Sequence, residues 1–296
     1  MTDWGYRAAG WLARRLPLAL TDALAASVAD LYVLTHPRTA RAVTRRLASL
    51  PRAAAPAANA AEPERPGAGA RETYRAFARA VRDFLRAERR AADAPRISID
   101  ERTRSILDRA RAEGMPTLVV SGHFGPWELA LGWLAREVGP LGALAAPHRS
   151  AAVERFFRGR RAAAGIRTLT AGSAASSALA TLRAGGWIAA LADRACAPRR
   201  RVDGLEGSVP IDRAPLLLAR RAGARVLAGV SWRGADGALH VRFLEPFTLG
   251  PRRDGLSLAQ GAARLQRFFD DHVRAHPTQW FDWAAAGPGR RGETDG

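Results

Sequence analysis

Lysine is absent from the sequence, so all 46 basic residues are arginines. This absence excludes P-loop nucleotide binding and Schiff-base catalysis, because both depend on a lysine side chain. The single cysteine, Cys196, excludes an internal disulfide and a cysteine-based zinc finger, and such sparing use of cysteine is typical of proteins on the cytosolic side. No stretch of 18 apolar residues occurs either, so we expect no membrane-spanning helix.

What is present describes a folded and strongly basic protein. The 296 residues are 47% hydrophobic, which is enough for one sizeable core or two small ones. Charged residues make up 25% of the chain, close to the globular average, and the formal net charge is +18. A charge of this size favours acidic partners, such as anionic lipid headgroups, an acidic protein or a nucleic acid.

The most apolar part of the N-terminal region, residues 16–34, is predicted to be an amphipathic helix. Pro17, Asp22 and Asp30 interrupt it, while leucine and valine recur at helical spacing, at Leu20, Leu24, Val28 and Leu31. The segment before it mixes aromatic residues with arginines: Trp4, Tyr6, Trp11, Arg7, Arg14 and Arg15. Two interpretations of that mixture stay open, a contact with the headgroup layer of a membrane or a helix packed on the protein's own core.

Residues 51–70 are rich in alanine and proline, and we expect them to form a flexible surface connection. A clear amphipathic helix follows. Its apolar stripe consists of Tyr74, Phe77, Val81, Phe84 and Leu85. An adjacent stripe is basic and consists of Arg71, Arg75, Arg79, Arg82, Arg86 and Arg89. This pattern fits a core-facing stripe beside a solvated face, or a basic surface that meets anionic lipid or an acidic carrier protein.

From about residue 116, short apolar runs alternate with helical segments. The predicted strands are 117–121, 143–146, 187–192, 226–232 and 239–243, and the predicted helices are 127–137, 153–164, 174–183, 214–222 and 258–276. The last two strands are expected to form a hairpin with a glycine-rich turn over 233–237. The pattern predicts an α/β fold, with a mainly parallel central sheet, helices on both of its faces and an N-terminal amphipathic helical region.

We expect a single domain over residues 1–296. It consists of an N-terminal helical part (1–115) that includes the connection at 51–70, an α/β core (116–283) and a polar tail (284–296).

The most informative segment is 119–129, Val-Val-Ser-Gly-His-Phe-Gly-Pro-Trp-Glu-Leu. A buried strand is predicted to end at Ser121, and a helix to begin with Pro126 at its first position. Ligand sites in open parallel sheets lie at such carboxyl ends of strands. The arrangement leaves His123 on the loop and Glu128 in the first helical turn, where the two side chains can approach each other.

A histidine held by a carboxylate is an oriented general base, able to remove a proton from a hydroxyl. Backbone N–H groups around Gly125 and the helix start could stabilise a developing oxyanion. No G-x-S-x-G motif occurs, so direct attack by an acceptor hydroxyl on a thioester fits better than a serine acyl-enzyme. The same residues also have ordinary structural interpretations, since Glu128 can cap a helix and His123 can be a satisfied loop histidine.

The segment Gly122-His123-Phe124-Gly125-Pro126-Trp127-Glu128 resembles the H-x-x-x-x-D/E block of the lipid A biosynthesis (lauroyl/myristoyl) acyltransferases, in which H-F-G-N-W-E is usual. These enzymes belong to the lysophospholipid-acyltransferase-like superfamily. Further segments resemble that family at matching distances: Pro147-His148-Arg149, Arg161 with Gly165, Ala192-Asp193-Arg194, Leu218-Ala219 with Gly223-Ala224, and His-Pro-Thr-Gln-Trp at 276–280. The opening segment 2–6 resembles the phosphatidylinositol mannoside acyltransferases of the same superfamily.

The resemblance implies an O-acyltransferase. It would move a fatty acyl chain from acyl-carrier protein or acyl-coenzyme A to a hydroxyl of a membrane lipid or glycolipid. The basic chain would work as a peripheral protein in contact with anionic lipid, on the cytoplasmic face of the inner (plasma) membrane. The acceptor stays open, because Ala195 stands where the family often has a second acidic residue, and the stretch 198–209 lacks the usual Phe-Phe-Gly.

Carried over residue by residue, the resemblance makes His123 the general base and Glu128 its orienting partner. Arg149 and Arg161 would hold phosphate or pantetheine groups, and Asp193 would shape the acceptor site. The remaining substrate-binding residues would be Arg194, Gly125 and Trp127. No metal or other cofactor is implied.

Other functions fit parts of the sequence. A nucleic-acid-binding protein is suggested by the charge, but no zinc finger, homeodomain, RNP or basic-zipper pattern accompanies it. A relative of the acyltransferases that holds lipid without transferring acyl groups is the other alternative. His272 and His276, four residues apart, suggest either a metal site or the end of a surface helix.

Overall fold

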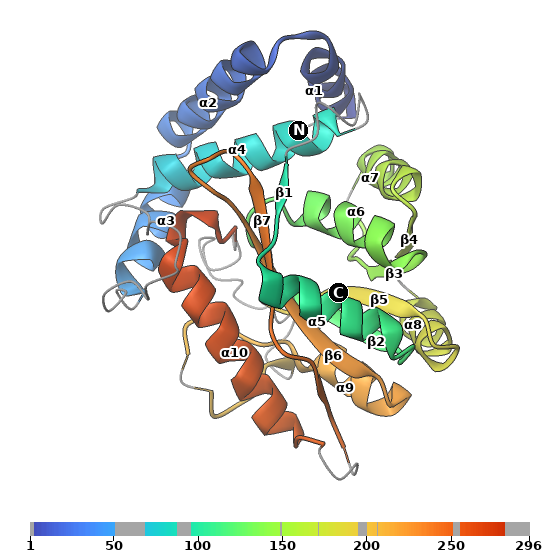
Figure 1. The fold of residues 1–296 in the computed structure, drawn as a ribbon. Coiled ribbons are helices and arrows are strands. Elements are labelled where there is room, and N and C mark those ends of the chain that lie inside the picture. Colours follow the sequence, from blue (N-terminus) through green and yellow to red (C-terminus); the bar gives the residue numbers. More distant parts are fainter. Residues whose placement is uncertain are drawn as a thin grey trace, which may run out of the picture.

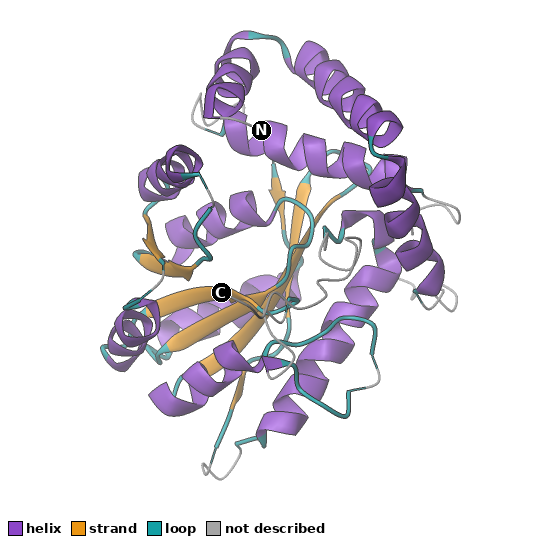
Figure 2. Cartoon of the chain, turned by 180° about the vertical axis from the view of Figure 1, so that it is seen from behind, coloured by secondary structure: helices purple, strands orange, loops and turns teal. Residues whose placement is uncertain are grey.

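The computed structural model describes residues 3–50, 69–87, 96–148, 150–170, 172–194, 200–205, 207–250 and 255–281. Figures 1 and 2 show a central sheet with helices on both faces and further helices at one end. The strands are β1 (Ile97–Ser98), β2 (Thr117–Ser121), β3 (Leu141–Leu144), β4 (Ile166–Leu169), β5 (Trp187–Leu191), β6 (Arg225–Arg233), β7 (Leu239–Phe243) and β8 (Phe247–Thr248). Their order is β1-β7-β6-β2-β5-β3-β4, with β8 also paired to β6.

The helices are α1 (Asp3–Arg15), α2 (Leu18–Thr35), α3 (Pro37–Ser49), α4 (Ala70–Arg86), α5 (Glu101–Ala112), α6 (Trp127–Val138), α7 (Ala151–Ala163), α8 (Ala174–Arg183), α9 (Arg213–Ala222) and α10 (Leu258–Ala275), followed by the short 3-10 helix Pro277–Gln279. β6 runs antiparallel to β7 and β8, and every other pairing is parallel. The predicted α/β fold, with its mainly parallel sheet and N-terminal helical region, is confirmed. The predicted connection at 51–70 falls mostly, and the polar tail entirely, outside the described residues.

Element boundaries agree best with the prediction where the sequence carries strong local signals. Strands β2 and β7 and helix α8 have the predicted bounds, and α10 begins as predicted because Ser257 and Gln260 form a capping box. β3 begins two residues before the predicted strand, only two residues after Gly139, which caps the end of α6 with a φ of +84°. The short strands β1, β4 and β8 were not predicted.

Two apolar layers cover the sheet. On one face, Leu118 and Val120 of β2 pack with residues of α8, α9 and α10. On the other, Val119 packs with residues of α5 and α6. Successive residues of β2 therefore enter opposite layers, as expected for a strand buried on both faces.

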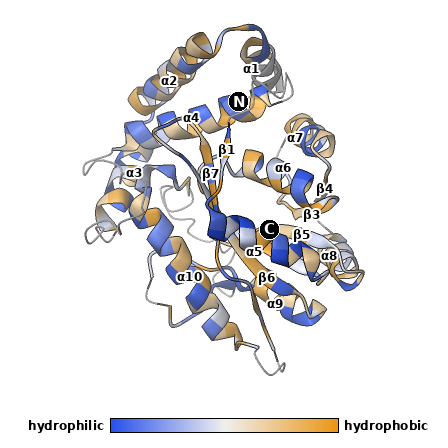
Figure 3. Cartoon of the chain, in the orientation of Figure 1, coloured by the Kyte–Doolittle hydropathy of each residue, from blue (hydrophilic) through white to orange (hydrophobic). Residues whose placement is uncertain are grey.

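Helix α2 has its apolar side outward. Among the described residues, eight large apolar side chains are exposed. Trp11 lies on α1, and the other seven lie on α2: Leu18, Leu20, Leu24, Val28, Leu31, Tyr32 and Leu34. Several of them appear as orange segments of α2 in Figure 3. By length and composition alone, α2 could cross a membrane, so the expected absence of a spanning helix stays a prediction.

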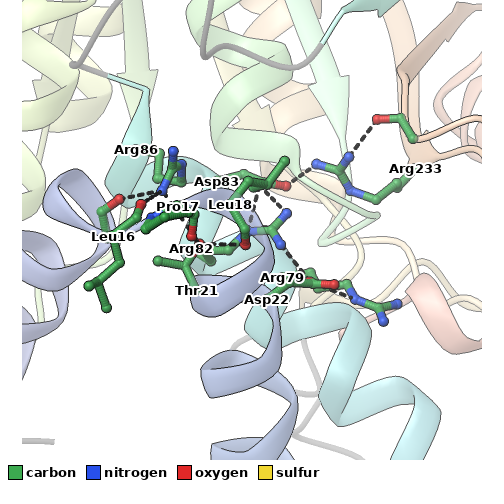
Figure 4. Close-up of polar contacts among 12 residues, drawn as sticks. Leu16, Pro17, Leu18, Thr21, Asp22, Arg79, Arg82, Asp83, Arg86 and Arg233 are labelled. Atoms are coloured by element: carbon green, nitrogen blue, oxygen red, sulfur yellow. Dashed lines mark hydrogen bonds and ion pairs between the residues drawn. The ribbon is translucent and has the colours of Figure 1, made fainter.

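The basic stripe of α4 is only partly solvated, because α1 and α2 cover much of it (Figures 1 and 4), while the Arg71 side chain stays 60% exposed. Arg82, which is 8% exposed, donates to Asp22 at 2.5 Å and to Asp83 at 2.6 Å. Arg86 donates to the backbone carbonyls of Ala13 and Leu16 at 2.6 and 2.8 Å.

The outer half of the same stripe holds the other acidic residue of α2. Both Arg71 and Arg75 form bidentate pairs with Asp30, with shortest distances of 2.6 and 2.5 Å. The two aspartates that interrupt the apolar run are thus the residues that fasten α2 to α4. Arg89 lies outside the described residues.

Candidate active site

The loop after β2 and the loop after β5 meet at the carboxyl edge of the sheet. The two strands are parallel neighbours, with Ser121 opposite Leu191, so His123 and Asp193 follow them at the same level. The His123 Nδ1 lies 2.8 Å from Asp193 Oδ1, and the backbone N–H of His123 donates to Asp193 Oδ2 at 2.9 Å. Asp193 therefore holds both the ring and the backbone of one histidine.

The partners of Asp193 fix its charge as well as its position. Its side chain is fully buried, and the indole N–H of Trp280 donates to Oδ2 at 2.9 Å. Burial by itself raises the pKa of Asp193, but the charge of the His123 ring and the hydrogen bonds from His123 and Trp280 lower it below its usual value. The residue is thus an anionic acceptor inside the protein.

This geometry sets the tautomer of His123. A carboxylate can only accept, so a ring proton lies on Nδ1, and in the neutral form of the ring Nε2 carries the lone pair. The side chain remains 19% exposed, and the ring of Trp127 lies edge-on to it with 5.3 Å between ring centroids. The arrangement can accept a proton at Nε2 while Asp193 stabilises the resulting imidazolium.

Glu128 lies elsewhere than the sequence suggested. Its carboxylate receives two hydrogen bonds from Arg161 of α7, one at 2.5 Å to Oε1 and one at 3.1 Å to Oε2. Burial lowers the pKa of Arg161, but the ion pair with Glu128 outweighs this effect and raises it. The carboxylate on His123 is that of Asp193, and Arg161 is engaged by Glu128 inside the protein. The pair joins the start of α6 to the end of α7.

Gly125 gives the loop its shape. Its φ is +51°, and a Cβ there would lie only 2.5 Å from the carbonyl oxygen of Ser231, so no other residue fits without a shift of the backbone. Its N–H donates to the carbonyl of Gln279 at 2.7 Å, so this one of the N–H groups predicted to stabilise an oxyanion is already engaged within the protein. Pro126 is the N-cap of α6 and not its first residue, and the helix begins at Trp127, where the predicted range 127–137 begins.

Two of the remaining predicted residues, Trp127 and Arg194, lie beside this centre. Arg194, next to Asp193, donates to the carbonyl of Phe281. His148 is held by a carboxylate in a similar way to His123, because its Nδ1 and its backbone N–H both contact Glu154 Oε2, at 2.8 and 3.0 Å. Arg149 lies outside the described residues.

Sequence reasoning missed how the closing segment contributes. Residues 279–281 run alongside the histidine loop, with Phe281 N–H donating to the carbonyl of His123 at 2.9 Å and an antiparallel bridge between Phe124 and Trp280. The resemblance of residues 276–280 to the acyltransferases singled out this segment, but it did not predict where the segment lies relative to His123. Only the fold brings it beside His123.

The histidine pair of α10 belongs to the interior. His272 and His276 are buried, and their rings lie beside Trp232 at 5.7 and 4.9 Å between centroids. Among the described residues, no group of three or more histidine, cysteine, aspartate or glutamate side chains is arranged to hold a metal ion. The pair does lie at the end of helix α10, as the other interpretation expected, but both rings are buried and not on the surface.

Comparison with known proteins gives the context of this site. Residues 1–283 match the bacterial lipid A biosynthesis acyltransferase family, and no individual curated protein matches the chain. The match spans the N-terminal helices, the His123 loop and the closing segment alike. The chain therefore belongs to the bacterial lipid A biosynthesis acyltransferase family, whose activity is acyl transfer in lipid biosynthesis.

Proposed function

We propose that this protein transfers a fatty acyl chain from a thioester, acyl-carrier protein or acyl-coenzyme A, to a hydroxyl of a membrane lipid or glycolipid, with His123 as the general base. The observation that carries the proposal is the pairing of His123 Nδ1 with the buried Asp193, which leaves Nε2 as the basic nitrogen. Family membership supports the reaction class.

The reaction needs one proton to move twice. Nε2 of His123 takes the proton from the acceptor hydroxyl while its oxygen attacks the thioester carbonyl. The tetrahedral intermediate then collapses, the carbon–sulfur bond breaks, and the departing thiolate takes the proton back from the imidazolium. The products are an ester and a free thiol, and no acyl-enzyme forms.

The proposal changes the role of two carboxylates. Asp193, expected at the acceptor, would orient His123 and stabilise its charged form. Glu128 would act through Arg161, by fixing the start of α6 and with it Trp127, whose ring lies against His123. Glu128 is then a positioning residue and not the partner of the base.

The charge of the chain supports both proposed partners. A net charge of +18 attracts the acidic carrier protein and anionic phospholipid by long-range electrostatics. We propose that α2 lies in the plane of the cytoplasmic surface of the inner (plasma) membrane, with its apolar side in the lipid. Asp22 and Asp30 support this orientation, because both face α4, and exposed arginines follow on α3: Arg38, Arg41 and Arg45.

Acyl transfer tests the reaction. The protein is incubated with acyl-coenzyme A or acyl-carrier protein and a total bacterial lipid extract, and new lipids are detected by mass spectrometry. We expect a lipid that gains one acyl group with the wild type, none with His123→Ala, and a normal yield with His240→Gln, a control on β7. Undiminished transfer by His123→Ala would refute the mechanism, and lipid bound without transfer under any donor would favour the lipid-binding alternative.

Vesicle sedimentation tests the membrane surface. Leu20→Glu with Leu24→Glu places two charges on the exposed side of α2, and we expect about a tenfold or greater loss of binding to vesicles containing anionic lipid. The matched control, Ala175→Glu with Ala180→Glu, adds the same charge to exposed positions of α8. Equal losses in both variants would mean that charge alone, and not the apolar side of α2, governs binding.

A further inference from the structure

We infer that Trp280 is a positioning residue for catalysis: its indole N–H fixes the orientation of the Asp193 carboxylate, and Arg46 of α3 holds Trp280 in place. The inference rests on the proposed role of His123 as the base. It assigns a function to the closing segment and connects the N-terminal helices to the catalytic histidine.

The two oxygens of Asp193 have different duties. Oδ2 accepts from the indole N–H of Trp280 and from the backbone N–H of His123, both at 2.9 Å, whereas Oδ1 faces the Nδ1 of His123 at 2.8 Å. Two donors on Oδ2 fix the plane of the carboxylate and so point Oδ1 at the ring. Without the indole N–H, only His123 would hold the carboxylate, through its backbone N–H and its ring, and rotation about the Cβ–Cγ bond would be less restricted.

Water cannot easily replace the lost donor. The Asp193 side chain is fully buried, and Trp280 is 2% exposed. When a buried carboxylate loses one of its hydrogen bonds, its anionic form is less stable, so it either changes position or takes up a proton more readily. We therefore expect the loop to keep its conformation while the ring of His123, and with it Nε2, is oriented less accurately toward the acceptor hydroxyl.

The backbone on both sides of Trp280 is tied to the histidine loop. Gln279 accepts from Gly125, and Phe281 donates to His123, at 2.7 and 2.9 Å. The Gln279 side chain in turn bonds both the N–H and the carbonyl of Arg233 in β6, at 2.8 and 3.0 Å. Trp280 is thus held relative to Asp193 through backbone as well as through its own ring.

Arg46 extends this arrangement to the N-terminal helices. Its guanidinium donates to the carbonyl of Trp280 at 2.9 Å and lies 4.6 Å from the centroid of the indole ring, a cation–π contact. Helix α3, which precedes the predicted connection at 51–70, therefore reaches to within one residue of the carboxylate that orients the base.

The experiment removes the N–H without removing the ring. Trp280→Phe is compared with replacement of Trp280 by 3-benzothienylalanine, in which sulfur stands where the indole N–H was. Trp187→Phe controls for loss of packing, because Trp187 is buried at the amino end of β5, the end of the strand away from Asp193. Two readouts are used: kcat and KM of acyl transfer, and the low-field NMR signal of the His123 Nδ1 proton, identified by its absence from His123→Ala.

We expect kcat to fall about 10- to 100-fold in both Trp280 variants, the loss of one hydrogen bond to a charged group, with little change in KM. The Nδ1 signal should shift or broaden in both, and Trp187→Phe should alter neither. A benzothienylalanine variant with wild-type kcat and an unchanged Nδ1 signal would overturn the inference, since the ring alone would then suffice. The NMR readout does not depend on turnover, so an inactive wild type would refute the proposed function while leaving the positioning of Asp193 measurable.

Arg46→Met tests the outer contact. We expect a smaller fall in kcat, about 3- to 10-fold, from loss of the cation–π contact and one hydrogen bond. Arg183→Met, an exposed arginine in the last turn of α8, is the control and should behave like the wild type. An unchanged kcat and Nδ1 signal in Arg46→Met would exclude Arg46 from the positioning of Trp280.

Discussion

Strand β2 and helix α2 are both apolar runs of the sequence, yet they lie in opposite environments. In β2, the residues from Thr117 to Val120 are buried, and their side chains enter the two layers on either face of the sheet. In α2, the apolar side chains face outward, and the helix is held from its polar side, through Asp22 and Asp30. An apolar run in the sequence therefore predicts an apolar environment, but it does not show whether the protein's own core or another molecule provides it.

The two regions are also held together by different forces. Apolar packing on both faces holds the sheet, a contribution of about 25 cal/mol for each Å² removed from water. The N-terminal helices share only a small apolar cluster, centred on Ala29, Val43 and Tyr74, and arginine–carboxylate pairs between α4 and α2 add to it. These pairs range from the buried Arg82 to the exposed Arg71. Because exposed pairs contribute little and buried ones are costly to break, the same substitution should have different consequences in the two regions.

The largest difference is expected from one isosteric change made in both places. Asp193→Asn keeps the shape of the side chain but removes the charge that stabilises the imidazolium of His123, so kcat should fall by about 1000-fold or more. Asp22→Asn, on α2, should leave kcat within about twofold, since Asp22 contacts only α4 among the described residues. Single-turnover acyl transfer measures both, and a near-normal rate in Asp193→Asn would show that another group orients the base.

The next difference concerns stability. Phe269 of α10 is fully buried and packs on Phe124 with 4.9 Å between ring centroids, so Phe269→Ala should lower the free energy of unfolding by about 3–5 kcal/mol. Leu24→Ala on α2 should change it by less than about 0.5 kcal/mol, because the side chain is already exposed. Urea unfolding followed by circular dichroism compares the two. A large loss in Leu24→Ala would place the outer side of α2 against protein, in a second copy of the chain or elsewhere.

Acid should weaken the core before it weakens the N-terminal pairs. Burial, with Arg242 and His240 nearby, lowers the pKa of His276 from 6.5 to about 4, and burial also lowers that of His272. The unfolded chain therefore binds protons that the folded chain does not. Stability is fully present above about pH 6.5 and declines toward pH 4, by about 2 kcal/mol at pH 5 for His276 alone.

Urea unfolding at pH 7 and pH 5 checks this direction. His276→Gln should flatten the pH dependence, whereas His36→Gln, an exposed control at the end of α2, should leave it as in the wild type. The carboxylates of α2 behave differently, because hydrogen bonds from Arg71 and Arg75 lower the pKa of Asp30 well below 3.8, so its pairs persist at pH 5. A wild type equally stable at both pH values would mean that the pKa values of His272 and His276 are not lowered in the folded protein.

The sequence predicted what depends on local pattern and missed what depends on strand order. His123 and Asp193 were both singled out, and β2 and β5 were both predicted as strands. What local spacing could not provide is that β5 lies next to β2 although β3 and β4 come between them in the chain, which brings Asp193 to His123. Spacing favoured Glu128 instead, because it is near in sequence.

The same limit applies to the polar contacts of α4. Periodicity placed its arginines on one stripe, but whether such a stripe meets water, lipid or carboxylates depends on a helix that precedes the connection at 51–70. Asp22 and Asp30 lie eight residues apart on α2, a spacing that puts them near the same side of a helix. Read together with the arginines of α4, that spacing was the one available signal for the pairing of the two helices.

The smallest effect should come from the pairs of Asp30, whose partners Arg71 and Arg75 are 60% and 34% exposed. Asp30→Asn removes the partner of Arg71 and Arg75 while keeping the shape of the side chain, and it should lower Tm slightly at low salt and not at all in about 1 M salt, where exposed charges are screened. Asp236→Asn, which breaks an exposed pair with Arg96 at the β6–β7 turn, is the matched control. If Tm fell strongly in Asp30→Asn and salt did not remove the difference, the pairing of α2 with α4 would behave like a buried contact. Asp30 would then stabilise the N-terminal helices as strongly as a buried group does, and these helices would not differ from the core in the way described above.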